Sequence, residues 1–371
     1  MEGTRPRTAS SIGMFDMLKG AGMLTIVFAH TAELYPLPTI SGLSLAAFFP
    51  FIYREALMAA FFIASGYGFR KRSISRCITQ QLKSLLRPYA WTALFTAVLH
   101  FIIHYKTFHY LPGTMGESLK VVGGFLMGLP HTTEYFGQEF FSCGPMWYLL
   151  ALLVGWILLD VILNIFPERY IPWAVAGCAL LGWGTSLVWE LPFCLIQGAV
   201  VVPYLYLGFL AKKHHLLDAP LPRRVFAGLL AATALIAVGA LVTRTTDCIS
   251  MAEWSLGPLS IFLDGAAGLL FIRLFMRLSR GHGIIVRLLE AVGRRSLNIF
   301  CVHTVELVAI PWYLMVARFS AQPLLGMCVQ YAVSMGSIWL VCELLRARRA
   351  LVIRFFPAKR RTPAVHYTAR H

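Results

Sequence analysis

Residues 48–72 read FFPFIYREALMAAFFIASGYGFRKR, a run of mostly apolar residues that ends at three consecutive basic ones. A helix that crosses a bilayer needs about 20 mostly apolar residues, and Lys and Arg gather on the cytoplasmic side of such helices. The stretch therefore predicts a transmembrane helix over 48–69 that ends at the cytoplasmic face, beside Arg70, Lys71 and Arg72.

The composition of the whole chain agrees with this interpretation. Of its 371 residues 58% are hydrophobic and only 13% are charged, and the mean hydropathy is +0.67. Soluble domains carry about 25% charged residues, so lipid is expected to face much of this protein. The net charge of +16 lies in clusters between the apolar runs. We interpret it as a topology signal and expect no nucleic-acid partner.

Further apolar runs predict an all-α, polytopic membrane protein with about ten transmembrane helices. The expected spans are residues 15–35, 48–69, 85–105, 145–163, 171–189, 193–211, 224–243, 254–276, 296–317 and 323–345. A shorter apolar piece over 119–130 is too brief to cross the membrane and is expected to be re-entrant. Its flanks, 106–118 and 131–144, are expected to form the longest loop.

The distribution of basic residues orients these helices. With the N-terminus in the cytoplasm, the Lys and Arg residues fall in cytoplasmic segments, apart from Arg54, Lys106, Lys120, Arg244 and Arg318. This asymmetry places the C-terminus in the cytoplasm as well. The predicted parts are a cytoplasmic N-terminal segment over 1–13, a transmembrane domain over 14–345 and a basic cytoplasmic tail over 346–371.

The first helix carries four ionisable residues, Asp16, Lys19, His30 and Glu33. A charged group at the bilayer centre costs at least about 2.5–3.5 kcal/mol on insertion scales, so such residues point to a function. At 100° per residue, Lys19 and His30 share one face and lie about 16 Å apart along the axis. We predict a polar stripe that ends at a histidine general base, which Glu33 orients. Alternatively, Asp16 and Lys19 are interfacial and His30 only bonds a neighbouring helix.

A second polar stripe is expected in the helix over 296–317. Ser296 and His303 are seven residues apart and therefore share a face, which Glu306 flanks. The sequence leaves a catalytic and a structural role for His303 equally open. Asp264 is a further acid within an expected span, for which packing is the favoured explanation.

Two groups of charged residues lie outside these stripes. The basic run from Arg70 to Arg72 can attract a phosphorylated ligand, although ordinary cytoplasmic charge explains it as well. Arg54 and Glu55 are expected to form a local ion pair, and the sequence leaves open a role for them in holding an acceptor.

Metal and disulfide chemistry have little support. His100 and His104 have a spacing that can bind metal on a helix, but no third ligand is evident, and no metal is predicted. The eight Cys residues are scattered. The sequence leaves open one disulfide among Cys143, Cys194 and Cys248.

The chain resembles the acyltransferase 3 family of integral membrane acyltransferases, which act mostly on cell-envelope sugars. The resemblance covers nearly the whole chain. It rests on six elements in the family's order: Asp16, Lys19-Gly20 and His30; Phe61-Phe62-Ile63-Ala64-Ser65-Gly66-Tyr67; Arg87-Pro88-Tyr89; Met146-Trp147-Tyr148-Leu149; Pro203-Tyr204-Leu205-Tyr206-Leu207-Gly208; and Gly293-Arg294-Arg295-Ser296-Leu297 with His303. Many members have Arg at the position of Lys19. Lys keeps the positive charge of Arg but lacks its bidentate hydrogen-bonding fork.

The resemblance implies an O-acyltransferase that uses acyl-CoA, usually acetyl-CoA, and a carbohydrate or glycolipid acceptor, in a bacterial plasma membrane. The implied catalytic residues are His30, Glu33 and His303, and the implied acyl-CoA-binding residues are Asp16, Lys19, Ser65, Arg70, Arg72 and Ser296. His30 would take the proton of the acceptor hydroxyl or carry the acyl group itself. The alternative function is a multi-pass transporter or flippase of a small polar or sugar-linked substrate. Membrane lipid is an expected partner, and the sequence does not give the oligomeric state.

Overall fold

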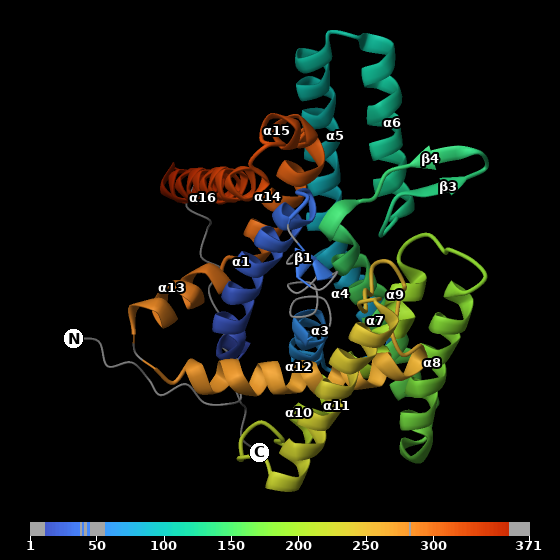
Figure 1. The fold of residues 1–371 in the computed structure, drawn as a ribbon. Coiled ribbons are helices and arrows are strands. Elements are labelled where there is room, and N and C mark those ends of the chain that lie inside the picture. The colour runs from blue at the N-terminus through green and yellow to red at the C-terminus, as the bar shows by residue number, and fades with distance from the viewer. Residues whose placement is uncertain (1–11, 38, 41–42, 45–55, 282, 356–371) are drawn as a thin grey trace, which may run out of the picture.

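The protein folds almost entirely into helices (Figure 1), and the computed structural model describes residues 12–37, 39–40, 43–44, 56–281 and 283–355. The helices are α1 (Asp16–Glu33), α3 (Met58–Tyr67), α4 (Ile74–Gln81), α5 (Arg87–Phe108), α6 (Leu111–Met127), α7 (Trp147–Ile165), α8 (Ile171–Ser186), α9 (Leu195–Val200), α10 (Val202–Lys213), α11 (Arg223–Thr243), α12 (Pro258–Leu278), α13 (Ile284–Gly293), α14 (Ser296–Ala309), α15 (Tyr313–Arg318) and α16 (Pro323–Phe355). Two short antiparallel hairpins join β1 (Thr39–Ile40) to β2 (Leu43–Ser44) and β3 (Thr133–Tyr135) to β4 (Gln138–Phe140).

Among the described residues, six helical segments are long and apolar enough to cross a membrane. They are Ile74–Phe108, Gly144–Ile165, Leu195–Lys213, Arg223–Thr243, Pro258–Leu278 and Pro323–Arg348, and each overlaps a predicted span. Three other predicted spans fall on helices that fail this test, because α1 carries three charged residues and α8 and α14 have 16 and 14 residues. The remaining span corresponds to α3, which is described from Met58. A multi-pass membrane protein is therefore supported, while ten spans and the orientation of the termini stay predictions.

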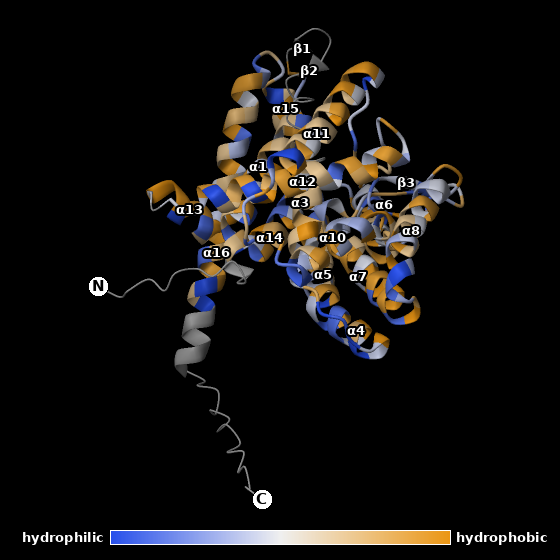
Figure 2. Cartoon of the chain, turned by 90° about the horizontal axis from the view of Figure 1, so that it is seen from below, coloured by the Kyte–Doolittle hydropathy of each residue, from blue (hydrophilic) through white to orange (hydrophobic). Residues whose placement is uncertain are grey.

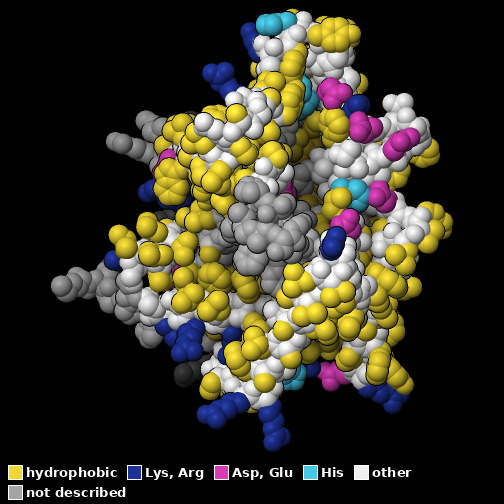
Figure 3. Space-filling model, in the orientation of Figure 1, with side chains coloured by type: hydrophobic (Ala, Val, Ile, Leu, Met, Phe, Trp, Pro, Cys, Tyr) yellow, Lys and Arg dark blue, Asp and Glu magenta, His cyan; other side chains and the backbone are white. Residues whose placement is uncertain are grey.

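The surface of the molecule fits contact with lipid. Large apolar side chains are exposed along α5, including Trp91, Leu94, Phe95 and Val98, and hydrophobic colour covers most helices in Figure 2, whereas α4 is largely hydrophilic. In Figure 3, Lys and Arg gather along the lower edge of the molecule, and Asp and Glu lie mainly at the upper right.

The prediction of a loop over 106–118 and a re-entrant piece over 119–130 is wrong in detail. A continuous helix, α6, covers Leu111–Met127 and packs along α5 to form a long helical hairpin (Figure 1). Pro112 in its first turn and the left-handed Gly128 after its last turn define its ends. The Tyr89 hydroxyl donates to the carbonyl of Phe125 at 2.5 Å and ties the two helices together.

Two further departures have local causes. The expected span over 296–317 is divided into α14 and α15, because Pro311 follows the end of α14 and cannot continue a helix. Helix α13, within a segment expected to be a basic connection, was not predicted. It packs against α1 more extensively than against any other element.

Glycines allow two of the closest helix crossings, and they come from the motif elements quoted above. At the crossing of α1 and α13, a Cβ on Gly20 would overlap the carbonyl of Leu289. At the crossing of α3 and α10, a Cβ on Gly66 would overlap the carbonyl of Leu205, and one on Gly208 would overlap that of Ile63. Small residues at helix interfaces let backbones approach in this way.

Adding one methyl group at the second crossing is expected to destabilise the fold. Gly208→Ala should lower the thermal unfolding temperature by several degrees, because overpacking costs about 1–3 kcal/mol. Gly177→Ala on α8 is the matched control, since nothing lies within 4 Å of a Cβ at that position. Thermal unfolding of the purified protein measures both, and equal effects would refute this account of the crossing.

Candidate functional site

One face of α1 lines a chain of three neighbouring cavities. The residues on this face, spaced by three or four, are Phe15, Lys19, Met23, Ile26, His30 and, just past the helix end, Leu34. This spacing keeps side chains on the same side of a helix. Two residues of the predicted stripe, Lys19 and His30, therefore line these cavities.

The first cavity, here called the Lys19 cavity, has a volume of about 340 Å³. It brings together three residues predicted to bind the same ligand, Lys19 of α1, Ser65 of α3 and Ser296 of α14. Its other walls are mostly apolar: Phe15, Met23, Ile26, Met58, Phe61, Ala64, Gly68, Tyr148, Leu149, Trp156, Leu297 and Phe300. The cavity is thus a largely hydrophobic slot with a cation and a few hydroxyl groups on its walls.

Two contacts fix the polar groups of the Lys19 cavity. Lys19 Nζ lies 2.7 Å from a carboxylate oxygen of Asp16, which is itself buried. The hydroxyls of Ser65 and Tyr148 are hydrogen-bonded at 3.1 Å. Asp16 therefore positions the cation rather than lining the cavity.

A narrow second cavity of about 60 Å³, here called the His30 passage, follows along α1. Its walls include Ile26, Met58, Tyr148 and Phe300, which it shares with the Lys19 cavity. On the other side it shares His30, Pro145, Trp147 and Ser250 with the third cavity. His30 therefore lies at the junction of two larger spaces.

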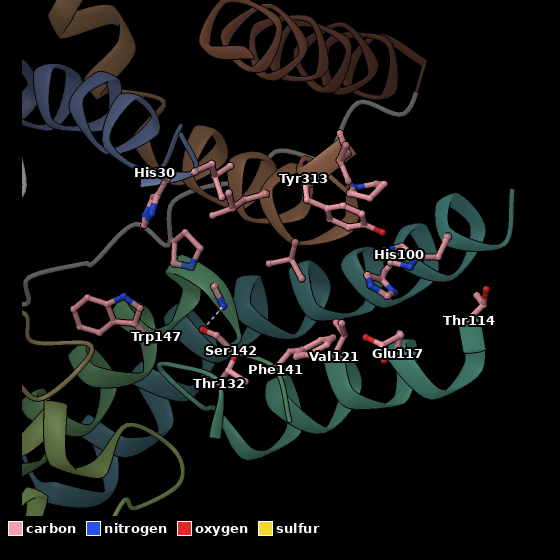
Figure 4. A pocket seen from close by; sticks show the side chains of 18 of the residues that line it. His30, His100, Thr114, Glu117, Val121, Thr132, Phe141, Ser142, Trp147 and Tyr313 are labelled. Carbon is pink, nitrogen blue, oxygen red and sulfur yellow. Dashed lines mark hydrogen bonds between the residues drawn. The ribbon is translucent and has the colours of Figure 1, made fainter. Parts of the chain in front are cut away.

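The third space, here called the wide cavity, has a volume of about 840 Å³ (Figure 4). The α5–α6 hairpin forms one side, the segment that follows β4 and the start of α7 form another, and α14 and α15 close it. Figure 4 shows His30 and His100 well separated along it. The Nδ1 atom of His100 is hydrogen-bonded to Ser118 at 3.0 Å, and the His100 ring stacks on that of His104 with centroids 3.9 Å apart.

A second histidine lies beside His30. The ring of His303, on α14, has its centroid 5.6 Å from that of His30. Its Nδ1 atom is 3.1 Å from Glu306, whose other carboxylate oxygen accepts a 2.6 Å hydrogen bond from Ser334 of α16. His303 is almost fully buried, with 3% of its side chain exposed, whereas 26% of His30 is exposed. The structure thus pairs an accessible imidazole with a buried, anchored one.

The two histidines share a sequence pattern. Residues 30–33 read HTAE and residues 303–306 read HTVE, and in both cases the Glu lies near the His of its own helix, at 3.6 Å for His30 and Glu33. This repeated tetrapeptide was the available signal that the two sites belong together. Ser334 carries no comparable signal and was missed.

Other predicted residues do not reach these cavities. Arg70 is exposed, and Arg72 donates its backbone N–H to Asp160 at 3.0 Å and its guanidinium to Gln80. Neither arginine lines the cavities described above, and nor does Glu33.

The remaining candidates have structural surroundings. Asp264 is buried and accepts a 3.5 Å hydrogen bond from Tyr204. Cys143, Cys194 and Cys248 are free thiols in this structure. Arg54 and Glu55 lie outside the described residues.

The chain was compared with known proteins. A family model described as an acyltransferase domain matches residues 12–343. This match includes every residue that lines the three cavities. No curated protein and no solved structure matches the chain.

Proposed function

The chain belongs to the acyltransferase 3 family and is a multi-pass membrane acyltransferase, and from this premise we propose that it acetylates a cell-envelope carbohydrate. The acyl donor is acetyl-CoA, the acceptor is a hydroxyl group of a sugar, and the location is a bacterial plasma membrane. One observation carries the proposal: His30 lines the wide cavity and the His30 passage, and that passage shares other wall residues with the Lys19 cavity.

The Lys19 cavity suits the donor. Lys19 would contact the phosphates of CoA, and the apolar walls would hold the pantetheine arm, with Ser65 and Ser296 available for its amides. The separation of about 16 Å between Lys19 and His30 along α1 is comparable to the length of an extended arm. Arg70 and Arg72 would act only by attracting the anionic ligand from outside the cavity.

The proposed reaction uses His30 as a general base. The imidazole removes the proton of the acceptor hydroxyl while that oxygen attacks the thioester carbonyl, and the C–S bond then breaks. The proton passes from His30 to the departing thiolate, which leaves as CoA thiol. Glu33 and the neighbouring His303–Glu306 pair would position His30 and stabilise its transient positive charge. A route through an acyl-histidine gives the same products.

A transfer assay and an uptake assay together distinguish the proposed reaction from the rival transport function. Purified protein with acetyl-labelled acetyl-CoA and an envelope extract should label the carbohydrate fraction and release CoA thiol in equal amount. Vesicles containing the protein should show no sugar uptake in the absence of CoA. Uptake of sugar without any acyl transfer would contradict the proposal.

Lys19 is expected to determine donor affinity. Lys19→Gln should raise the KM for acetyl-CoA about ten-fold, because a charge-assisted contact contributes about 1.5–3 kcal/mol, and should leave kcat within about two-fold. Lys19→Arg should behave like the wild type, as in family members that carry Arg.

The phosphate contact has its own control. Acetyl-pantetheine lacks the CoA phosphates, so the wild type and Lys19→Gln should use it equally poorly. Lys213→Gln, which removes a cation paired with Glu168, should leave the KM for acetyl-CoA unchanged. A KM that is equally insensitive to Lys19→Gln would place the phosphates elsewhere.

A further inference from the structure

The wide cavity has no role yet assigned to its own lining. His30 lines it but does not line the Lys19 cavity, and the two cavities share no lining residue. A second substrate in the wide cavity could therefore meet the donor at His30 without competing for its site. The volume of about 840 Å³ is within the usual range for small-ligand sites.

Aromatic side chains occur along this cavity, and Figure 4 shows Trp147 near His30, Phe141 in the middle and Tyr313 toward His100. The aromatic residues of the cavity are Phe108, Tyr110, Phe141, Trp147 and Tyr313. Their flat apolar faces can pack against the C–H faces of a sugar ring. Histidine, threonine and serine side chains on the same walls can hydrogen-bond hydroxyl groups.

The charge of the cavity is equally informative. Its titratable lining residues are His30, His100, His104, Glu117, Tyr110 and Tyr313, and no Lys or Arg is among the described residues that line it. Lys120, next to the cavity wall, is already paired with Glu117 and Glu139, at 3.1 Å each. A phosphate or carboxylate group placed here would lose its hydration, which is costly, and the described lining offers it no permanent cation.

His104 is suited to choosing the acceptor. Its ring stacks on that of His100 and contacts the tilted ring of Phe108 at a centroid distance of 5.5 Å, and no described residue hydrogen-bonds it. His100, in contrast, is buried and already bonded to Ser118. The ring nitrogens of His104 are therefore available to a ligand in the cavity.

We infer that the wide cavity is the acceptor site, that it selects an uncharged polyhydroxylated ring, and that His104 is a specificity-determining residue. This inference rests on the proposed function and adds to it the charge class of the acceptor. The preference for an uncharged ring rests on the described lining, which contains no permanently charged Lys or Arg. The role of His104 rests on its ring nitrogens, which no described residue hydrogen-bonds.

The charge class can be tested with two glycosides that differ at one carbon. Octyl β-glucoside and octyl β-glucuronide share a ring and a chain, but only the second carries a carboxylate. The protein in phospholipid nanodiscs, free of glycoside detergent, should acetylate the neutral probe at least ten-fold faster than the anionic one. Equal or preferred use of the glucuronide would overturn the inference, and so would failure to label the glucoside while the envelope extract is labelled.

A designed cation should relax this preference. Thr132 lines the cavity and is exposed, so Thr132→Lys is expected to fold and to raise transfer to the glucuronide several-fold. An unchanged ratio between the two probes in a folded Thr132→Lys protein would contradict the role of charge.

The role of His104 is tested through the acceptor alone. His104→Ala should raise the glucoside concentration needed for half-maximal rate about three- to ten-fold, as expected for the loss of one hydrogen bond. The KM for acetyl-CoA should stay the same, and His104→Asn should recover part of the loss. Thr107→Ala, on an exposed turn of α5, is the control.

The outcomes separate the two proposals. An unchanged acceptor dependence in His104→Ala, in a preparation that still transfers acetyl groups, would refute the specificity role and leave the enzyme assignment intact. Absence of any transfer by the wild type, to the extract and to both probes, would instead refute the proposed function and this inference with it.

Discussion

Replacing His30 with alanine is expected to lower the rate of acetyl transfer about 10²–10⁴-fold, the range typical of a lost general base. The reason is positional, because His30 lines both the wide cavity and the narrow passage whose other walls belong to the Lys19 cavity as well. The affinity for acetyl-CoA should change little, since the phosphate contact assigned to Lys19 lies about 16 Å away along the helix. Transfer from labelled acetyl-CoA to the envelope extract gives the rate.

Two controls make the His30 result specific. His109→Ala replaces an exposed histidine just after α5 and should retain the wild-type rate. Added imidazole should restore part of the activity of His30→Ala, because the deletion leaves a space beside an existing passage, and should not affect His109→Ala. A folded His30→Ala protein that transfers label at the wild-type rate would remove His30 from the mechanism.

Glu306 carries the second large expected effect. Glu306→Gln should lower kcat about 10–100-fold and change the KM for each substrate by less than about two-fold. The carboxylate holds His303 at 3.1 Å and accepts a 2.6 Å bond from Ser334, and the ring of His303 lies 5.6 Å from that of His30. Without that charge, the imidazolium formed on His30 loses stabilisation where little water is available to replace it.

The loss of kcat in Glu306→Gln is expected to arise through His303. The double variant His303→Ala with Glu306→Gln should therefore be little worse than the more damaging single variant, as expected for residues of one network. Glu343→Gln is the control. It removes a carboxylate of α16 that is paired with Arg295 and Arg346. A fall in stability with an unchanged kcat would make Glu306 a purely structural residue.

Some features of the fold follow from local sequence and were predictable. Apolar runs of sufficient length specify helices in lipid, because backbone polar groups must be satisfied within the segment, and the six long apolar segments were expected on this ground. The segment over 106–130 was not predicted as one helix, because its apolar piece over 119–130 is too short to cross a membrane. In the structure, Val121 and Phe125 are buried and hold α6 in place.

The candidate site was predicted unevenly. Lys19, Ser65 and Ser296 come from three separate helices and line one cavity, in agreement with the grouping made from the family resemblance. Arg70 and Arg72 were grouped with them because a basic run at the cytoplasmic face can attract phosphate groups. In the structure the cavity lining extends only to Gly68 on this segment, and the backbone N–H of Arg72, before α4, donates to Asp160 of α7.

The sequence by itself determined the membrane class of the protein, the family and the stripe from Lys19 to His30, because each depends on composition, order or the helical period alone. Only the tertiary structure decided what faces that stripe. His303 comes to His30, Ser334 reaches Glu306, and the α5–α6 hairpin encloses the wide cavity through contacts between residues far apart in the chain. Such contacts depend on how helices pack, including the backbone approach at Gly20 and Gly293, and no local periodicity encodes them.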